Sequence, residues 1–203
     1  FCMCPGGIIA PAATSPGEIV VNGWSPSKRN NPFANSGIVV SVEVKDLDKK
    51  FGRDPLSLMR FQQSVEQLAF QAGGGNLQAP AQRLVDFCEK RSSSTLPVCS
   101  YLPGIASVNM QEVLPAFIYE RLQVGFRQVG EKMKNYFTNE AVVVATESRT
   151  SSPVRIPRDP QLLSHPQLST LFPCGEGAGY AGGIVSAAME GEKVAAAIIN
   201  QLA

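Results

Sequence analysis

A run of glycines near the end of the chain constrains this sequence more than any other feature. Residues 173–183 read Pro-Cys-Gly-Glu-Gly-Ala-Gly-Tyr-Ala-Gly-Gly and lead into a helix-like segment at 184–199. Glycine lets a backbone turn tightly, and the start of a helix offers unpaired N–H groups and the positive end of its dipole. The run therefore predicts an anion-binding turn that contacts a phosphate or cofactor, or a turn that only allows close helix packing.

The glycine spacing matches no standard phosphate-binding fingerprint. Gly175-x-Gly177-x-Gly179 followed by Gly182-Gly183 is neither a Walker loop nor the Gly-x-Gly-x-x-Gly that opens a dinucleotide-binding fold. The helix after it is strongly periodic, because apolar or small residues recur at threes and fours: Ile184, Ala187, Ala188, Gly191, Ala195, Ile198, Ile199 and Leu202. These small residues predict that another surface packs closely against the helix.

The rest of the chain divides into β-rich ends and a helical middle. Runs rich in β-branched residues predict strands at 18–22, 37–44 and 142–145. Helices are predicted from the Asp54-Pro55 start to Gly73, from Pro80 to about Lys90, and after Pro115. The faces expected to be buried are Leu58, Phe61, Val65, Leu68 and Ala72 in the first helix, Leu84, Phe87 and Cys88 in the second, and Ile118, Leu122, Phe126, Val129, Met133 and Phe137 in the third.

These elements predict an α/β chain of the α+β kind. Residues 1–44 and 141–203 are expected to form one discontinuous unit, interrupted by a mainly helical insertion at 45–140. The ends of the insertion, near Val44 and Val142, should lie close together so that the flanking strands share a sheet, because closing a folded insertion costs little more than closing a short loop.

Composition narrows the classes of partner. With 18 basic and 17 acidic side chains the net charge is +1, which disfavours nucleic acid and acidic membranes. No apolar run reaches the roughly 18 residues that span a bilayer. Five cysteines make no disulfide framework, so we expect a cytoplasmic protein.

A few side chains are candidates for chemistry. Either Cys2 or Cys4 is a reactive thiol beside a turn, or both are small buried hydrophobes, and no spacing predicts a metal site. Arg149 can bind a carboxylate or phosphate, or can pair with Glu147 or Asp159. His165 is expected to be a surface or capping residue, and Trp24 a core residue.

Several motifs together resemble one family. They are Phe1-Cys-Met-Cys-Pro-Gly-Gly7, Asn22-Gly-Trp-Ser25, Asn35-Ser-Gly-Ile-Val-Val40, Arg60-Phe-Gln-Gln63 with Ala72-Gly-Gly-Gly-Asn76, the segment 147–159, and the glycine run with the residues that flank it, 172–188. The chain resembles the C-terminal part of bacterial FAD-dependent dehydrogenases of poorly defined substrate. Members of that family begin with a Rossmann half that grips the ADP of FAD, and residues 1–203 contain no such loop, so we expect a fragment of a larger flavoprotein.

The resemblance implies an FAD-dependent oxidoreductase in which this part provides the flavin-ring and ribityl side of the site. It assigns cofactor binding to Gly175, Glu176, Gly177, Ala178, Gly179, Tyr180, Ala181, Gly182, Gly183 and Ile184, with Glu176 accepting a ribityl hydroxyl. It places Cys4, Arg149 and Arg155 near the flavin or substrate. The missing Rossmann half is the expected partner, NAD(P)H a candidate electron donor, and the 203 residues alone are expected to lack bound FAD and activity. The alternative is a non-catalytic ligand-binding or protein-interaction module that uses the helical block.

Overall fold

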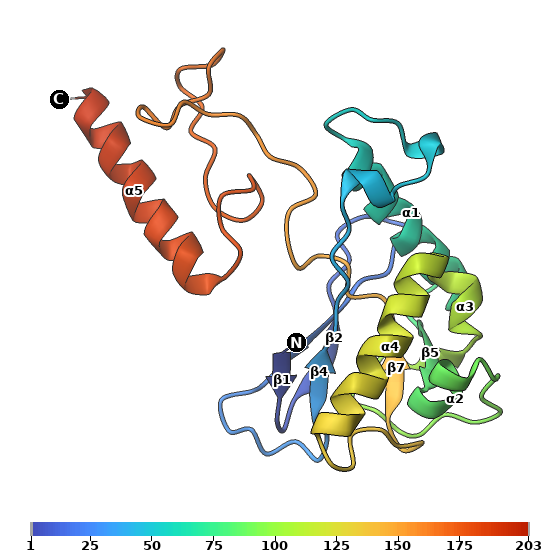
Figure 1. The fold of residues 1–203 in the computed structure, drawn as a ribbon. Coiled ribbons are helices and arrows are strands. Elements are labelled where there is room, and N and C mark those ends of the chain that lie inside the picture. Colours follow the sequence, from blue (N-terminus) through green and yellow to red (C-terminus); the bar gives the residue numbers. More distant parts are fainter. Residues whose placement is uncertain (1, 203) are drawn as a thin grey trace. The chain divides into compact units, whose positions relative to one another are not determined.

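The computed structural model describes residues 2–202 and divides them into two compact units (Figure 1). The first unit contains the residues up to Val42 together with Gln62–Ser148, and the second contains Glu43–Phe61 together with the residues from Arg149 onward. Small sheets and several helices occur in one chain, which confirms the predicted α+β class.

Four short strands of the first unit form two antiparallel pairs. Strand β1 (Cys2–Cys4) pairs with β4 (Asn35–Gly37), and β2 (Ile8–Pro11) pairs with β3 (Val21–Trp24). The strand predicted at 37–44 was wrong beyond Gly37, because Ile38 and Val40 pack against a helical core instead of pairing with a strand. The strand predicted at 18–22 begins three residues later, and Trp24 at its end is 48% exposed rather than in the core.

A three-stranded sheet lies at the centre of the first unit. Strand β5 (Ala79–Arg83) pairs in parallel with β6 (Ile105–Ser107) and antiparallel with β7 (Val142–Val144). The helix predicted from Pro80 was therefore wrong over its first four residues, and only α2 (Leu84–Glu89) is helical. Alanine and an N-terminal proline favour a helix locally, but β5 is buried and gains partners on both edges.

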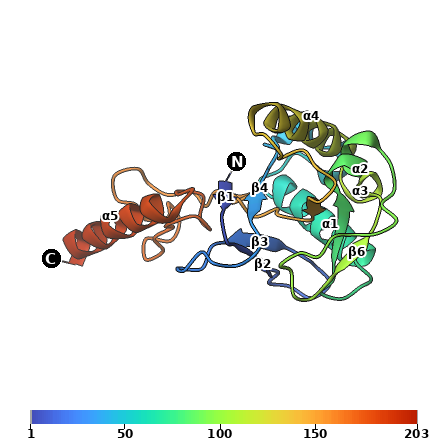
Figure 2. The ribbon, with the colours of Figure 1, turned by 90° about the horizontal axis from the view of Figure 1, so that it is seen from below.

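Three further helices complete the first unit. They are α1 (Ser57–Ala72), which continues into it from the second unit, α3 (Met110–Val113) and α4 (Ala116–Lys132). Helices α2 and α4 lie side by side (Figure 2), with the ring of Phe87 4.5 Å from that of Tyr119 and 5.4 Å from that of Phe126. The Tyr119 hydroxyl donates to the carbonyl of Phe87 at 2.6 Å, so this core also satisfies its polar atom.

The predicted faces of these helices are largely confirmed. Leu84, Phe87, Cys88, Leu122 and Phe126 are buried, as are Phe61 and Val65 on α1. Leu68 is an exception at 42% exposure, because the α1 face continues at four-residue spacing through Ala69, which is fully buried. Helix α1 ends where predicted, at Gly73–Gly75.

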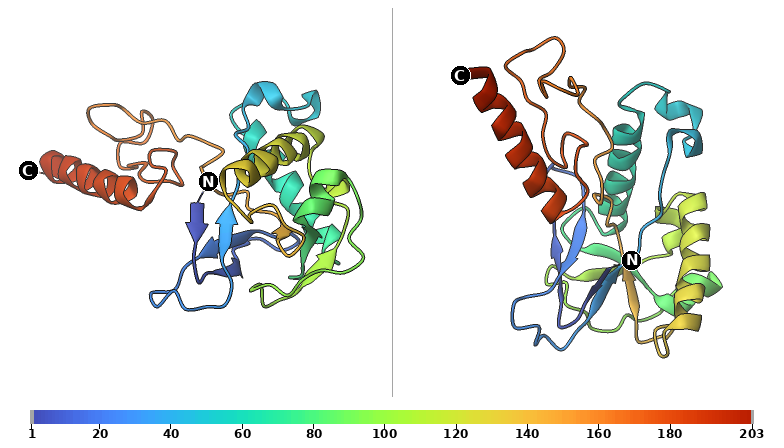
Figure 3. Two further views of the ribbon diagram at one scale, coloured as in Figure 1. Left: turned by 60° about the horizontal axis from the view of Figure 1, so that its bottom comes forward. Right: turned by 60° about the vertical axis from the view of Figure 1, so that its left-hand side comes forward.

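The second unit contains the short 3₁₀ helices η1 (Val44–Asp46) and η2 (Lys49–Phe51), and the long helix α5 (Ile184–Leu202). An irregular segment from Arg149 runs alongside α5 before entering it (Figures 1 and 3). Helix α5 confirms the helix predicted after the glycines. Its apolar side chains nevertheless stay exposed, with Ile184 at 92%, Val185 at 71% and Met189 and Ile199 at 65%, whereas Val194 is buried.

The observed units divide the chain differently from the expected 1–44 with 141–203 and 45–140. Their boundaries fall after Val42, Phe61 and Ser148. The reason is the sheet β6-β5-β7. Strand β5 belongs to the block 45–140 that was expected to be helical, and it pairs with β7, which lies after that block. Within residues 2–202, no helix has both the length and the apolar character needed to cross a membrane.

Candidate functional site

The glycine run folds as a compact turn ahead of α5. Gly175 and Gly179 have φ of 73° and 83°, a region that side-chain-bearing residues rarely adopt. The amide of Gly179 donates to the carbonyl of Glu176, and that of Tyr180 donates to the carbonyl of Gly175, each at 2.9 Å. The turn is therefore closed by its own backbone.

The amides where the glycine turn enters α5 have no acceptors among the described residues. Within residues 2–202, no hydrogen bond is made by the N–H groups of Gly183, Ile184 and Val185. Ser186 occupies the neighbouring position, since its hydroxyl donates to the carbonyl of Gly183 at 2.9 Å and accepts from the amide of Gly182 at 3.3 Å. A helix of 19 residues that begins this way offers donors and a positive dipole end to an anion or to a polar ligand edge.

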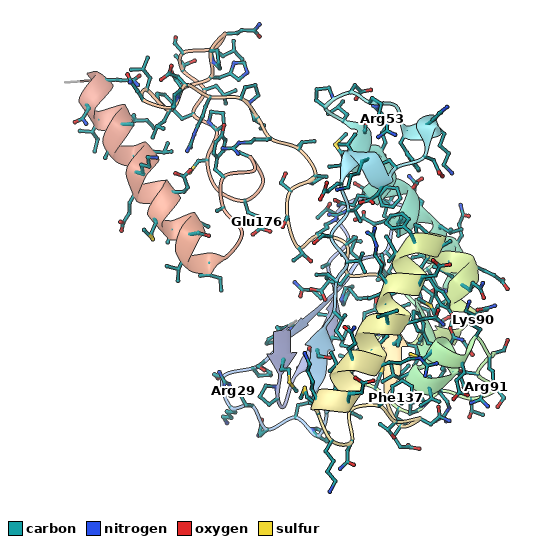
Figure 4. The ribbon with its side chains drawn as sticks, viewed as in Figure 1. Arg29, Arg53, Lys90, Arg91, Phe137 and Glu176 are labelled. Atoms are coloured by element: carbon teal, nitrogen blue, oxygen red, sulfur yellow. The ribbon has the colours of Figure 1, made fainter. Side chains whose placement is uncertain are left out.

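Space surrounds parts of the turn. Among residues 2–202, no atom other than those of the glycine and its chain neighbours lies within 4 Å of the point where a Cβ would stand on Gly177 or Gly182, and neither glycine has a positive φ. Neither packing within this chain nor backbone strain therefore calls for glycine at these two positions. Glu176 is exposed on the same turn (Figure 4), so its carboxylate can accept hydrogen bonds from outside the chain.

Gly179 has the opposite environment. A Cβ there would stand 2.8 Å from the carbonyl oxygen of Val154 and 3.1 Å from the Cα of Arg155. The turn therefore packs closely against the segment that contains Arg155. The predicted cofactor-binding glycines and the predicted substrate-binding arginine thus lie next to each other. The Cζ of Arg155 lies 4.4 Å from the ring centroid of Tyr180, and the Cζ of Arg158 lies 3.6 Å from it.

The first unit gathers other motifs into a second cluster, which we call the motif cluster: Cys4, Gly7, Gly23, Asn35, Gly37 and Glu147. Cys4 pairs with Asn35 across β1 and β4, and the Asn35 side chain donates to the carbonyl of Ile8 at 3.3 Å. A Cβ on Gly23 would stand 2.2 Å from the Oδ1 of Asn35, and one on Gly7 would stand 2.5 Å from its Nδ2. The two glycines therefore make room for the asparagine amide.

Glu147 joins the motif cluster from the end of β7. Its Oε2 would be 2.9 Å from a Cβ on Gly37, so this glycine leaves space for the carboxylate. Burial raises the pKa of Glu147 above its ordinary value. A half-buried carboxyl with a raised pKa can hold and release a proton closer to neutral pH. The sequence alone predicts Glu147 only as a possible ion-pair partner of Arg149.

Two buried carboxylates lie nearby in the same unit. Glu66 on α1 is 1% exposed and accepts hydrogen bonds from Ser148 at 2.5 Å and Gln62 at 2.9 Å. Glu18 is 5% exposed and accepts from Gln63 at 2.9 Å. The glutamine pair of the Arg60-Phe-Gln-Gln63 motif thus binds buried acids, which gives this motif a structural role.

The other candidates have local roles. Cys4 is half-buried, and burial raises the pKa of Cys88 to about 11, which leaves Cys88 a protonated core residue. The Nδ1 of His165 accepts from the amide of Gln167 at 3.2 Å, as expected of a capping residue. Arg149 is half-buried after Ser148, and its role stays a prediction. In the part of the chain that the structure describes, no group of histidine, cysteine or carboxylate side chains could hold a metal ion.

Comparison with protein families identifies the larger part of the chain. Residues 1–150 match the model of the FAD-dependent protein C-terminal domain-like family. The chain belongs to this family. The match includes the whole motif cluster and ends before the glycine turn.

One relative extends the similarity to the rest of the chain. An uncharacterized protein of Clostridium beijerinckii is 43% identical over 203 residues, which is 99% of this chain. The chain spans 37% of the length of that relative. The glycine turn and α5 are therefore included in the similarity, and the relative contains additional sequence.

Proposed function

We propose that this chain is the C-terminal part of an FAD-dependent oxidoreductase of the dehydrogenase type, and that it contributes the flavin-ring and ribityl side of the cofactor site. The observation that carries the proposal is the start of α5, where three amides lack acceptors beside glycines with open space. Membership of an FAD-dependent protein family supports the choice of cofactor.

The residues of the turn suit such a cofactor. The amides at Gly183–Val185 would face the electron-rich edge of the flavin or its pyrophosphate, and Glu176 would accept a hydrogen bond from a ribityl hydroxyl. Gly177 and Gly182 would allow close approach of the ligand to the backbone. When bound, flavin supplies the hydride or electron chemistry, and the protein orients it and surrounds it with dipoles.

Other candidates for chemistry lie outside the glycine turn. Cys4 and Arg149 are candidates for contact with flavin or substrate, and Glu147 is a candidate proton donor or acceptor because of its raised pKa. An N-terminal Rossmann half would bind the ADP of FAD and would cover the exposed apolar side chains of α5. NAD(P)H is the proposed electron donor, and the cytoplasm the proposed compartment.

The test uses the intact protein, meaning the longer polypeptide that carries this chain. Its visible absorption spectrum and FAD content are measured for the parent, for Glu176→Gln and for Glu176→Ala, with Lys132→Ala as an exposed control. We expect one FAD per chain in the parent and the control, a mild loss in Glu176→Gln, and weakening by about 1–3 kcal/mol in Glu176→Ala, which leaves a bound hydroxyl unpaired.

Two results would count against the proposal. A colourless intact protein would reject the flavin assignment and favour a non-catalytic binding module. Full FAD content in Glu176→Ala would reject the role of this carboxylate. The isolated 203 residues are expected to lack FAD, because the contacts to ADP would be missing.

A further inference from the structure

A pocket of about 500 Å³ lies within the second unit, between the arginine-bearing loop and α5. Its lining includes Arg155, Arg158, Tyr180 and Lys193, with Pro157, Pro160 and Leu163 as the apolar part. A second hollow of about 420 Å³ shares Arg158, Tyr180 and Lys193 with this pocket and continues along α5 as far as Ser186 in its first turn. The size is that of a small-molecule site, and apolar walls with a few polar groups are typical of one.

One of the three cations is already neutralised. Arg158 donates to Glu190 at 2.7 Å and to the carbonyl of Pro173 at 2.8 Å. Both side chains of this ion pair are largely buried, at 6% and 12% exposure. Arg158 therefore shapes the pocket and fixes α5 to the loop, while adding little free charge.

The other two cations have no such partner. Within residues 2–202, neither the guanidinium of Arg155 nor the ammonium of Lys193 makes a hydrogen bond or an ion pair. Arg155 is nevertheless positioned, because it packs over the Tyr180 ring, whose hydroxyl donates to the carbonyl of Ile156 at 2.9 Å. A guanidinium that is held in place with its donors unused is suited to a planar or tetrahedral oxyanion.

The position of Lys193 separates this pocket from the helix start. Lys193 follows Ile184 by nine residues, which places its Cα about 13.5 Å along the helix axis at 1.5 Å per residue. Donors of the first turn act only on groups close to that turn. An anion held by Lys193 is therefore a different group from one held by the first amides of α5.

We propose that this pocket binds the phosphate of a phosphorylated small molecule, with Arg155 and Lys193 as its ligands and the proline and leucine side chains against its organic part. Arginine binds phosphate oxygens through paired N–H groups and lysine does so as a point charge, so the two together favour phosphate. The pocket shares Tyr180 and Arg155 with the residues assigned to the flavin side, so the test uses protein that is already saturated with FAD.

Calorimetric titration of the intact, FAD-saturated protein tests the proposal, with pyrophosphate, AMP and adenosine as probes. We expect saturable binding of AMP or pyrophosphate and none of adenosine. Arg155→Ala and Lys193→Ala should each weaken binding about tenfold or more, as loss of a charge-assisted contact does, while the charge-matched control Lys132→Ala changes nothing. Tighter binding of AMP than of pyrophosphate is expected, and binding of pyrophosphate as tight as that of AMP or tighter would overturn the contact with an organic part.

Three results would overturn the proposal: no saturable binding, unchanged affinity in both Arg155→Ala and Lys193→Ala, or binding that FAD saturation abolishes. Flavin content is measured on the same samples, and circular dichroism verifies that each variant is folded. A protein that retains FAD but binds no phosphate defeats this inference alone, whereas a protein without FAD defeats the proposed function alone.

Discussion

Arg158 and Glu190 form an ion pair of 2.7 Å that is almost withdrawn from solvent, and it ties the loop at 149–183 to helix α5. Such a pair is costly to break on one side, because the remaining charge stays buried without compensation. This loop lines the pocket and contains the glycine turn, so the pair supports the geometry of both.

The first prediction concerns this ion pair. Glu190→Ala should lower the free energy of opening of α5 by about 3–5 kcal/mol, the usual cost of leaving one partner of a buried pair. Amide hydrogen exchange in α5 of the intact protein measures this quantity. The matched control is Glu192→Ala, an exposed glutamate on the same helix, which should have little effect. Equal protection of α5 in Glu190→Ala and the parent would show that the pair contributes nothing.

The second prediction separates two glycines of one turn. Gly179→Val should destabilise the turn and lower FAD occupancy, because φ is 83° and the new Cβ would stand 2.8 Å from the carbonyl of Val154. A Cβ on Gly177 would meet no atom of residues 2–202 within 4 Å beyond its chain neighbours, so the turn of Gly177→Val should fold normally. We expect Gly177→Val to lose FAD. Without cofactor, this variant and the parent should have the same melting temperature.

Absorption spectra and thermal melts of both variants decide the matter. If Gly177→Val retains full FAD content, the open space at this glycine does not receive the cofactor. If Gly179→Val retains both FAD content and stability, the close contact with Val154 is not needed.

The third prediction follows from the raised pKa of Glu147. The folded protein keeps a proton on this carboxyl at pH values where the unfolded chain, near its ordinary pKa of 4.5, has lost it. Stability should therefore decrease as pH rises from about 4.5 through the folded pKa, with the loss complete above it. Glu147→Gln should remove this slope and raise the melting temperature at neutral pH.

Melting temperatures between pH 4 and pH 8 measure the effect, with Glu140→Gln as an exposed control that should keep the slope of the parent. The same slope in Glu147→Gln would mean that another group causes it.

The fourth prediction concerns the motif cluster. Gly23→Ala would place a Cβ 2.2 Å from the Oδ1 of Asn35, so the amide must move and its hydrogen bond to Ile8 should weaken. We expect a loss of about 1–3 kcal/mol in stability, typical of overpacking. Adding Asn35→Ala should recover part of that loss, a coupling that chemical denaturation of the double mutant can measure.

Gly125→Ala is the control for this experiment. Gly125 lies inside α4 with open space at its Cβ position, so alanine there should stabilise the helix by about 0.5–1 kcal/mol. If Gly23→Ala is as well tolerated as Gly125→Ala, the contact between Gly23 and Asn35 is not tight.

Helices α1, α4 and α5 were predictable because their signals are local. Each has an apolar face at helical spacing, and Asp54-Pro55, Pro115 and the glycines before Ile184 mark where they begin. Strand β5 was not predictable from its own residues. Its conformation depends on β6 and β7, which are distant in sequence, and its alanines and proline favour a helix until those partners are present.

The same distinction applies to the candidate site. The glycine turn was visible in the sequence because its composition is unusual. Contact of Arg155 with Tyr180 joins residues 25 positions apart, and the approach of Asn35 to Gly23 depends on how two strand pairs meet. Neither contact leaves a periodic signal. The motifs that carry the resemblance contained these residues without indicating which of them touch.

The exposed side chains of α5 have a practical consequence for handling the 203 residues alone. Ile184, Val185, Met189 and Ile199 give one helix a row of solvent-facing apolar groups. Proteins that exist as free monomers seldom tolerate large patches of this kind, and a net charge of +1 provides little mutual repulsion between molecules. The chain by itself should therefore self-associate as its concentration rises, and mild detergent should disperse the aggregates.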